Sequence, residues 1–134
     1  MQSLVARRTR SALLIVTCAV AISGAVSCLG KNTVKAGQLS PGGSYKAELI
    51  EGDTGAVGGW VSVVRVSKAK PTLAEKILGR GKETIFGVDV QSQRVSMKWQ
   101  SDTRLEIVCR QCNPNQVEVQ KTVWGDVLIS YFFQ

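Results

Sequence analysis

Apolar and polar residues alternate one by one through much of the second half of this 134-residue chain. The two clearest stretches are RVSMKWQ (94–100) and RLEIVC (104–109), which are separated by the short polar segment SDT. A period of two places successive side chains on opposite faces of an extended strand, and two such strands around a short turn form a hairpin. The alternation therefore predicts an antiparallel β-sheet with one apolar face.

Further strands are predicted along the chain, and a single helix interrupts them. The other strand segments combine β-branched or aromatic residues with flanking turn residues: SYKAELI (44–50), WVSVVRVS (60–67), TIFGVDV (84–90), QVEVQ (116–120) and VWGDVLISYFF (123–133). Between residues 67 and 84, Thr72 can cap a helix, Glu75 completes a capping box, and Gly79 is typical of a helix end. We expect an all-β domain with one short helix, in which six to seven strands form an antiparallel meander packed as a sandwich or a curled sheet.

The first thirty residues differ in kind from the rest of the chain. Arginines at positions 7, 8 and 10 precede a run of 20 uncharged residues from Ser11 to Gly30, and every acidic residue lies later. Such a segment is typical of an export signal, and it is also long enough for a membrane-spanning helix. In both cases the arginines favour a cytoplasmic N-terminus and export of the remainder. We therefore expect a signal peptide or membrane anchor (1–27), a polar tether (28–38) and an extracytoplasmic β domain (39–134).

Cys28 follows the small and apolar residues Ala25-Val26-Ser27. This stretch resembles the lipobox of bacterial lipoproteins, although Ala25 stands where the lipobox favours leucine. The resemblance implies that the Cys28 sulfur carries a diacylglycerol and that Cys28 becomes the N-terminus after cleavage. An uncleaved helical anchor and plain secretion are the alternatives. The expected location is the bacterial cell envelope, with the domain held at the membrane and facing the periplasm or the exterior.

Cys109 and Cys112 form the motif CRQC at the end of a predicted strand. Outside the cytoplasm such a pair tends to oxidise, so we expect a structural disulfide that fixes a turn. A thioredoxin-type redox pair needs its first cysteine at a helix N-terminus, whereas Asn-Pro-Asn follows this pair. A zinc site needs four ligands, and the chain has no histidine to add to these two cysteines. Neither a metal ion nor another cofactor is expected.

Two motifs resemble those of small extracytoplasmic β modules. LSPGGSYKAEL (39–49) is similar to their S-P-D-G-K-Y opening, with Gly42 and Ser44 in place of Asp and Lys. VSMKWQSDTRLEIVC (95–109) is similar to their hairpin motif, W-x-S-D-x-x-L-x-I. Together the motifs resemble an uncharacterised bacterial family of small lipoprotein or membrane-anchored β domains, over about Leu39 to Cys109. The resemblance implies a fold and an envelope location, but no activity.

A basic stretch around the predicted helix is the main candidate contact region. It contains one acidic residue, Glu75, and six basic ones: Arg65, Lys68, Lys70, Lys76, Arg80 and Lys82. Close to a membrane, this stretch can bind anionic head groups. Aromatic residues that would stack on bases are not interleaved with it, so nucleic acid is not an expected partner. The alternative interpretation is a solvated connection whose charge keeps it soluble.

The glycine-rich loop between Asp53 and Trp60 is the second candidate contact region. Its DTGA sequence (53–56) matches a signature of retropepsin-like aspartic proteases. Glu51-Gly52 precede the Asp, however, where those proteases have apolar residues, so a flexible loop is the favoured interpretation.

Three classes of function fit these features. The favoured hypothesis is a non-enzymatic envelope module that binds a protein partner or an anionic polymer through a sheet face or the two loop regions. A thiol-disulfide oxidoreductase that acts through Cys109 and Cys112 is the enzymatic alternative. An inhibitor or immunity protein directed against an envelope-acting toxin is the third.

Overall fold

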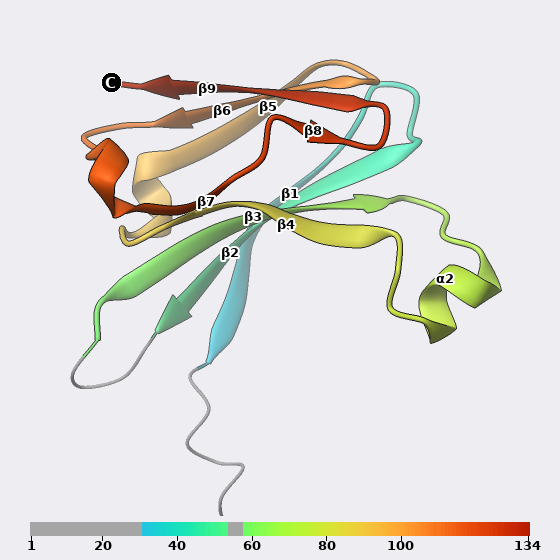
Figure 1. Ribbon diagram of the computed structural model, residues 1–134, viewed down its shortest axis with the longest axis horizontal. Helices are drawn as coiled ribbons and strands as arrows, with labels where there is room; N and C mark the ends of the chain where they lie inside the picture. The colour runs from blue at the N-terminus through green and yellow to red at the C-terminus, as the bar shows by residue number, and fades with distance from the viewer. Residues whose placement is uncertain (1–30, 54–57) are drawn as a thin grey trace, which may run out of the picture.

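The computed structural model describes residues 31–53 and 58–134, which fold as two facing β-sheets (Figure 1). In the five-stranded sheet the spatial order is β1 (Asn32–Leu39), β2 (Tyr45–Asp53), β3 (Trp60–Lys68), β4 (Lys82–Val88) and β7 (Val117–Gln120). In the four-stranded sheet the order is β5 (Val95–Ser101), β6 (Arg104–Cys109), β9 (Val127–Phe133) and β8 (Val123–Trp124). Short helical segments lie between strands: α2 (Leu73–Ile77), η2 (Ser92–Arg94) and η3 (Pro114–Gln116). The predicted all-β fold with one short α-helix is confirmed for this part of the chain.

Two predicted segments differ from the structure. Residues 32–38, expected to belong to a polar tether, are part of β1, which pairs antiparallel with β2. All eight residues of β1 are exposed, so backbone pairing rather than an apolar face places them in the sheet, and their composition gave no sign of it. The segment 123–133, expected as one strand, is divided into β8 and β9 by a turn at Gly125, whose φ is 56°. Left-handed φ values of this kind favour glycine.

The strand order is a meander in the first sheet and more complex in the second. β1 to β4 are sequential antiparallel neighbours, and β7 pairs antiparallel with the far side of β4. The predicted hairpin is β5–β6, in which Met97 lies opposite Ile107. β9 then pairs parallel with β6, because the chain first crosses to the five-stranded sheet to form β7 and returns through β8.

The core lies between the two sheets and is built from the inward-facing positions of the predicted alternation. The five-stranded sheet contributes Ala47, Leu49, Val64, Val66, Ile85, Phe86 and Val88. The four-stranded sheet contributes Val95, Met97, Trp99, Leu105, Ile107, Cys109, Val127 and Ile129. Burial of such side chains stabilises a fold by about 1.5–3 kcal/mol each.

Polar bonds join the sheets at two places. On one side the Trp99 indole Nε1 donates to the Gln38 carbonyl oxygen at 3.2 Å, and the Gly42 N–H donates to Asp102. The first bond joins β5 to β1, and the second connects the SPGG turn with the SDT turn. On the other side the half-buried Tyr131 hydroxyl reaches the Ile85 carbonyl at 3.0 Å and also the Lys121 carbonyl. Burial raises the pKa of Tyr131 to about 12, so this phenol stays protonated and remains a donor.

The membrane predictions concern residues outside the described part. Residues 1–27 and the lipidation candidate Cys28 are not among the residues that the structure describes. Among the residues it does describe, no helix has the length and apolar character needed to cross a bilayer.

Candidate binding surface

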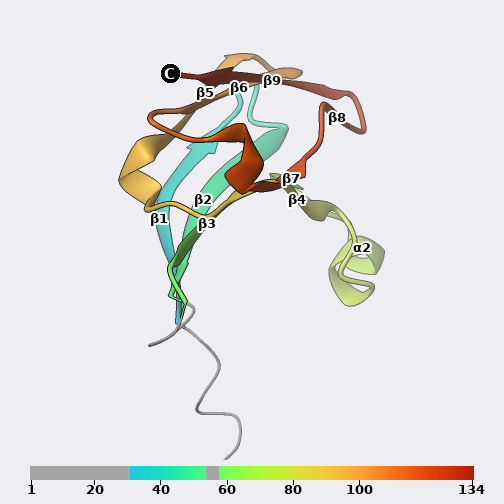
Figure 2. The ribbon, with the colours of Figure 1, turned by 60° about the vertical axis from the view of Figure 1, so that its left-hand side comes forward.

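The connection from Lys68 to Lys82, called the basic arm below, projects from the sandwich beside the ends of β3 and β4 (Figures 1 and 2). Its helix begins where the sequence predicts. The Thr72 Oγ1 accepts from the Glu75 N–H at 3.2 Å, and a Glu75 carboxylate oxygen accepts from the Thr72 N–H at 2.8 Å. The helix ends before Gly79, whose φ is 65°. The predicted capping box is therefore confirmed, and it holds α2 through local bonds.

The apolar side chains of α2 do not pack on either sheet. Leu73, Ile77 and Leu78 are 73%, 75% and 62% exposed, and the helix has no buried residue. An isolated helix of five residues gains little from its own backbone bonds, and most short helices are stabilised by burying an apolar face. Here that face is directed to solvent, and the described part of the chain does not cover it.

The basic arm carries five basic residues and one acidic residue, a net charge of +4. Glu75 pairs with Lys68 at 2.6 Å, and this hydrogen bond raises the pKa of Lys68 and lowers that of Glu75, so both stay ionised. Within residues 31–53 and 58–134 the remaining four, Lys70, Lys76, Arg80 and Lys82, form no ion pair. The uncompensated charge and the exposed apolar face thus belong to the same segment.

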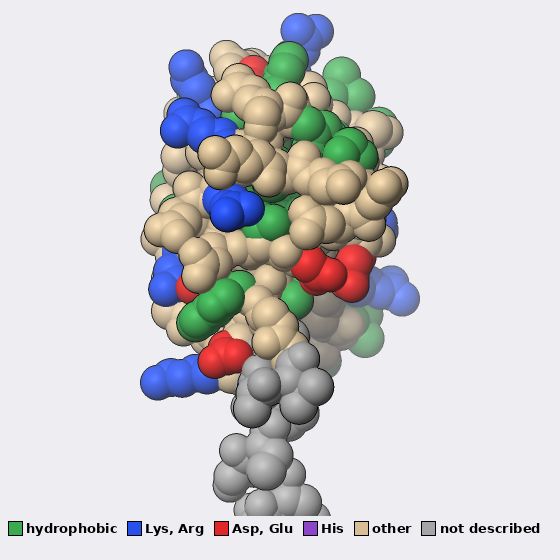
Figure 3. Space-filling model, turned by 90° about the vertical axis from the view of Figure 1, so that its left-hand side faces the viewer, with side chains coloured by type: hydrophobic (Ala, Val, Ile, Leu, Met, Phe, Trp, Pro, Cys, Tyr) green, Lys and Arg blue, Asp and Glu red, His purple; other side chains and the backbone are tan. Residues whose placement is uncertain are grey.

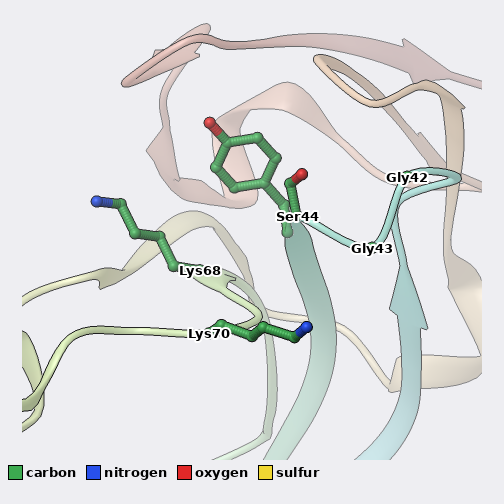
Figure 4. A pocket seen from close by; sticks show the side chains of 6 residues that line it. Gly42, Gly43, Ser44, Lys68 and Lys70 are labelled. Carbon is green, nitrogen blue, oxygen red and sulfur yellow. The ribbon is translucent and has the colours of Figure 1, made fainter.

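Two shallow hollows border the arm and share Lys68. The first, of about 370 Å³, is lined by Gly42, Gly43, Ser44, Tyr45, Lys68 and Lys70. In Figure 4 the Lys70 side chain extends toward β2, whereas Lys68 points the other way. The second hollow, of about 270 Å³, lies between α2 and the strand ends and is bordered by Lys68, Glu75, Lys76, Arg80 and Lys82. Cationic groups that surround a hollow of this kind favour an anionic group in it.

The other predicted contact residues do not join the arm. Arg65 was predicted as part of the basic stretch, but it lies in the middle of β3, opposite Glu48 of β2, and does not belong to the arm. Asp53 pairs with Trp60 at the other end of β3. Lys68 lies eight positions after Trp60 along β3, a span of about 26 Å. The predicted contact residues therefore form two separate regions, and residues 54–57 of the DTGA loop lie outside the described part.

A buried carboxylate near Trp60 was missed by the sequence analysis. The Glu51 side chain is 10% exposed, accepts from the Ser92 N–H at 2.7 Å and pairs with Lys35 at 3.0 Å. Hydrogen bonding by the Ser92 side chain and the Ser92 N–H, helped by the Lys35 ammonium, lowers the pKa of Glu51 to about 2. No local pattern connects residues 35, 51 and 92, because their proximity depends on the pairing of β1 with β2 and on the loop after β4.

Cys109 and Cys112 are joined by a disulfide with a Cα–Cα distance of 5.6 Å. Cys109 is the last residue of β6 and belongs to the core, with 1% of its surface exposed. Only the three-residue segment η3 follows the pair, so the described structure offers no helix N-terminus to stabilise a Cys109 thiolate. These features match a disulfide that fixes a turn.

The end of the sandwich that carries the C-terminus presents basic and acidic side chains interspersed among uncharged atoms (Figure 3).

Comparison with models of protein families, with curated proteins and with solved structures gave no match to this chain.

Proposed function

We propose that the protein is a membrane-tethered extracytoplasmic binding module, without enzymatic activity, and that its basic arm binds an anionic surface. The single observation that supports this most is the combination on one arm of four cations without ion pairs and three exposed apolar side chains. A segment that only had to stay soluble would gain nothing from exposing leucine and isoleucine beside its charges. Basic residues with adjacent apolar side chains are the pattern that binds anionic lipid surfaces.

The position of the arm supports the same proposal. In Figures 1 and 2 α2 and the start of β1 both lie on the side of the molecule that faces away from the four-stranded sheet. A flat surface on that side can contact the arm. A tether raises the local concentration of the arm at the membrane, so each contact of the arm needs little affinity of its own.

Hydrogen exchange on the full-length chain in nanodiscs tests this proposal. Discs of phosphatidylcholine alone are compared with discs that also contain phosphatidylglycerol. We expect slower exchange across residues 69–81 in the anionic discs, because each basic residue near such a surface contributes about 1 kcal/mol. The slowing should disappear at high salt and in the Lys70→Gln/Lys76→Gln/Arg80→Gln variant.

A variant with the same loss of charge elsewhere provides the control. Arg94, Arg104 and Arg110 are exposed and lie away from the arm, so Arg94→Gln/Arg104→Gln/Arg110→Gln should keep the slowing. Equal exchange of the arm in both kinds of disc, or equal loss in both variants, would refute arm binding.

The tether has its own test, which concerns Cys28. The intact mass of the membrane fraction is measured with and without an inhibitor of lipoprotein signal peptidase. A mature chain that begins at Cys28 and carries added acyl mass would support lipidation. A full-length, unmodified mass would support the anchor instead.

A further inference from the structure

A third hollow, of about 210 Å³, lies at the end of the sandwich opposite the arm. It is bordered by the bulge of β1, the end of β2, the start of β3 and the segment that leads into β5; its lining residues are Lys35, Glu51, Trp60, Gln91, Ser92 and Gln93. We propose that this hollow binds an uncharged saccharide. The site is distinct from the arm, and the proposal does not depend on the arm binding a membrane.

The polar wall of the hollow is fixed before any ligand arrives. Glu51 is held between the Ser92 N–H and Lys35, as described above. The buried Ser62 hydroxyl donates to the Val90 carbonyl at 2.6 Å and holds the segment just before Gln91 against β3. The Gln93 amide donates to the Gln91 side-chain oxygen at 2.6 Å. A wall built in this way loses little conformational entropy when a ligand binds.

The charge of the hollow excludes most other ligand classes. Its one carboxylate, Glu51, and its one ammonium, Lys35, form an ion pair at 3.0 Å and neutralise each other. The lining therefore offers no unpaired charge to bind an anion or a cation. The remaining groups are two amides and a hydroxyl, which can both donate and accept hydrogen bonds, and an indole, which donates only. A neutral ligand with many hydroxyl groups matches this set.

Trp60 supplies the apolar contact that such a ligand needs. Trp60 is 43% exposed. Tryptophan at the end of a strand is usually covered by the core, where it contributes through buried area. An exposed indole beside amides can instead stack on the C–H face of a pyranose ring while the amides bond its hydroxyls. An apolar surface with a few convergent polar groups is the usual composition of a small-molecule site.

Titration of the full-length chain with neutral oligosaccharides tests the proposal. The chain is held in a detergent without a sugar head group, and cellotetraose, chitotetraose and maltotetraose are added while binding is followed by saturation-transfer NMR and tryptophan fluorescence. We expect at least one of them to bind with a Kd of about 1 mM or tighter. Trp60→Ala should weaken that binding by about tenfold or more, whereas Trp60→Tyr should retain most of it.

Phe132→Ala serves as the matched control, because Phe132 is 49% exposed and lies on the four-stranded sheet, away from the hollow. It should leave binding unchanged. If Trp60→Ala fails to fold, Gln91→Ala and Gln93→Ala provide the same test, since both side chains are exposed and line the hollow. The proposal is overturned if none of the three oligosaccharides binds, or if binding is indifferent to these substitutions. Binding only of acidic polysaccharides, lost in the Lys70→Gln/Lys76→Gln/Arg80→Gln variant, would also overturn it while supporting the arm.

Discussion

Glu51 gives the sharpest test of how this sandwich is held together, through the dependence of its stability on pH. In the folded chain the pKa of Glu51 is lowered from 4.5 to about 2 by hydrogen bonds from Ser92, with a smaller effect from Lys35. A lowered folded pKa means that the stabilisation is complete above the unfolded pKa and is lost as the pH falls through the folded one. The relevant window is therefore from about pH 5 down to about pH 2.

The size of the effect follows from the pKa values. A difference from 4.5 to about 2 corresponds to about 3 kcal/mol, because each pKa unit is worth about 1.4 kcal/mol. Lys35 is 43% exposed, so water screens its part of the interaction and reduces the total. We expect Glu51→Gln, which keeps the shape but not the charge, to lower the free energy of unfolding by about 2 kcal/mol at pH 7.

Urea unfolding of the purified chain at pH 7, 5, 3 and 2 measures the difference. The gap between wild type and Glu51→Gln should close as the pH falls toward 2, because the wild-type carboxyl group is then protonated as well. Glu48→Gln is the control: Glu48 pairs with Lys46 at 2.5 Å on a more exposed part of β2, and surface pairs contribute about 1 kcal/mol or less. A gap that stays constant from pH 7 to pH 2, or that is absent at pH 7, would refute the reasoning.

Three further predictions concern stability. Cys112→Ser should lower the free energy of unfolding by about 2 kcal/mol, because a disulfide across so short a loop removes little entropy from the unfolded chain. Thermal unfolding with and without reductant measures this loss. Rapid reduction of the disulfide in the native state would contradict a purely structural role. Gly42→Ala should destabilise the fold because its new Cβ would clash with the Asp102 carboxylate. Combined with Asp102→Ala, the same substitution should cause most of that destabilisation to disappear. A double-mutant cycle by urea unfolding measures this coupling, and additive effects of the two substitutions would contradict the contact. Single serine substitutions of the exposed arm residues Leu73, Ile77 and Leu78 should each change the free energy of unfolding by less than about 0.5 kcal/mol. Ile85→Ala in the core should lower it by about 2–5 kcal/mol. If thermal unfolding shows losses in the arm variants as large as in Ile85→Ala, the arm is part of the core.

The features that could be predicted from the sequence are those set by neighbours along the chain. The alternation of apolar and polar residues correctly predicts the buried side chains of the β5–β6 hairpin: Met97, Trp99, Leu105 and Ile107. Successive side chains of a strand point to opposite faces, so the pattern within one strand is enough to identify its buried face. The capping box of Thr72 and Glu75 is equally local and was found in the same way. The basic arm was recognised as a segment for the same reason.

The features that could not be predicted depend on pairing between distant segments. β1 has no buried residue, so its place in the sheet follows only from backbone bonds to β2. The parallel β6–β9 pair depends on the route of the chain through β7, which local periodicity does not report. The Lys35–Glu51–Ser92 cluster depends on the pairing of β1 with β2 and on the loop after β4, and no local pattern in the sequence indicates either.

The way the arm is stabilised bears on how it can work. Its helix is held by the Thr72–Glu75 bonds and by the ion pair of Glu75 with Lys68, all within the segment, and it contributes no side chain to the core. The sandwich is complete without it, so changes in Leu73, Ile77 or the four remaining cations can alter binding with little effect on the fold. Because Glu75 neutralises Lys68, the uncompensated charge in the described arm is that of Lys70, Lys76, Arg80 and Lys82, on the same segment as the exposed apolar side chains. Both features on which the proposed surface binding depends thus lie on a segment that contributes nothing to the core.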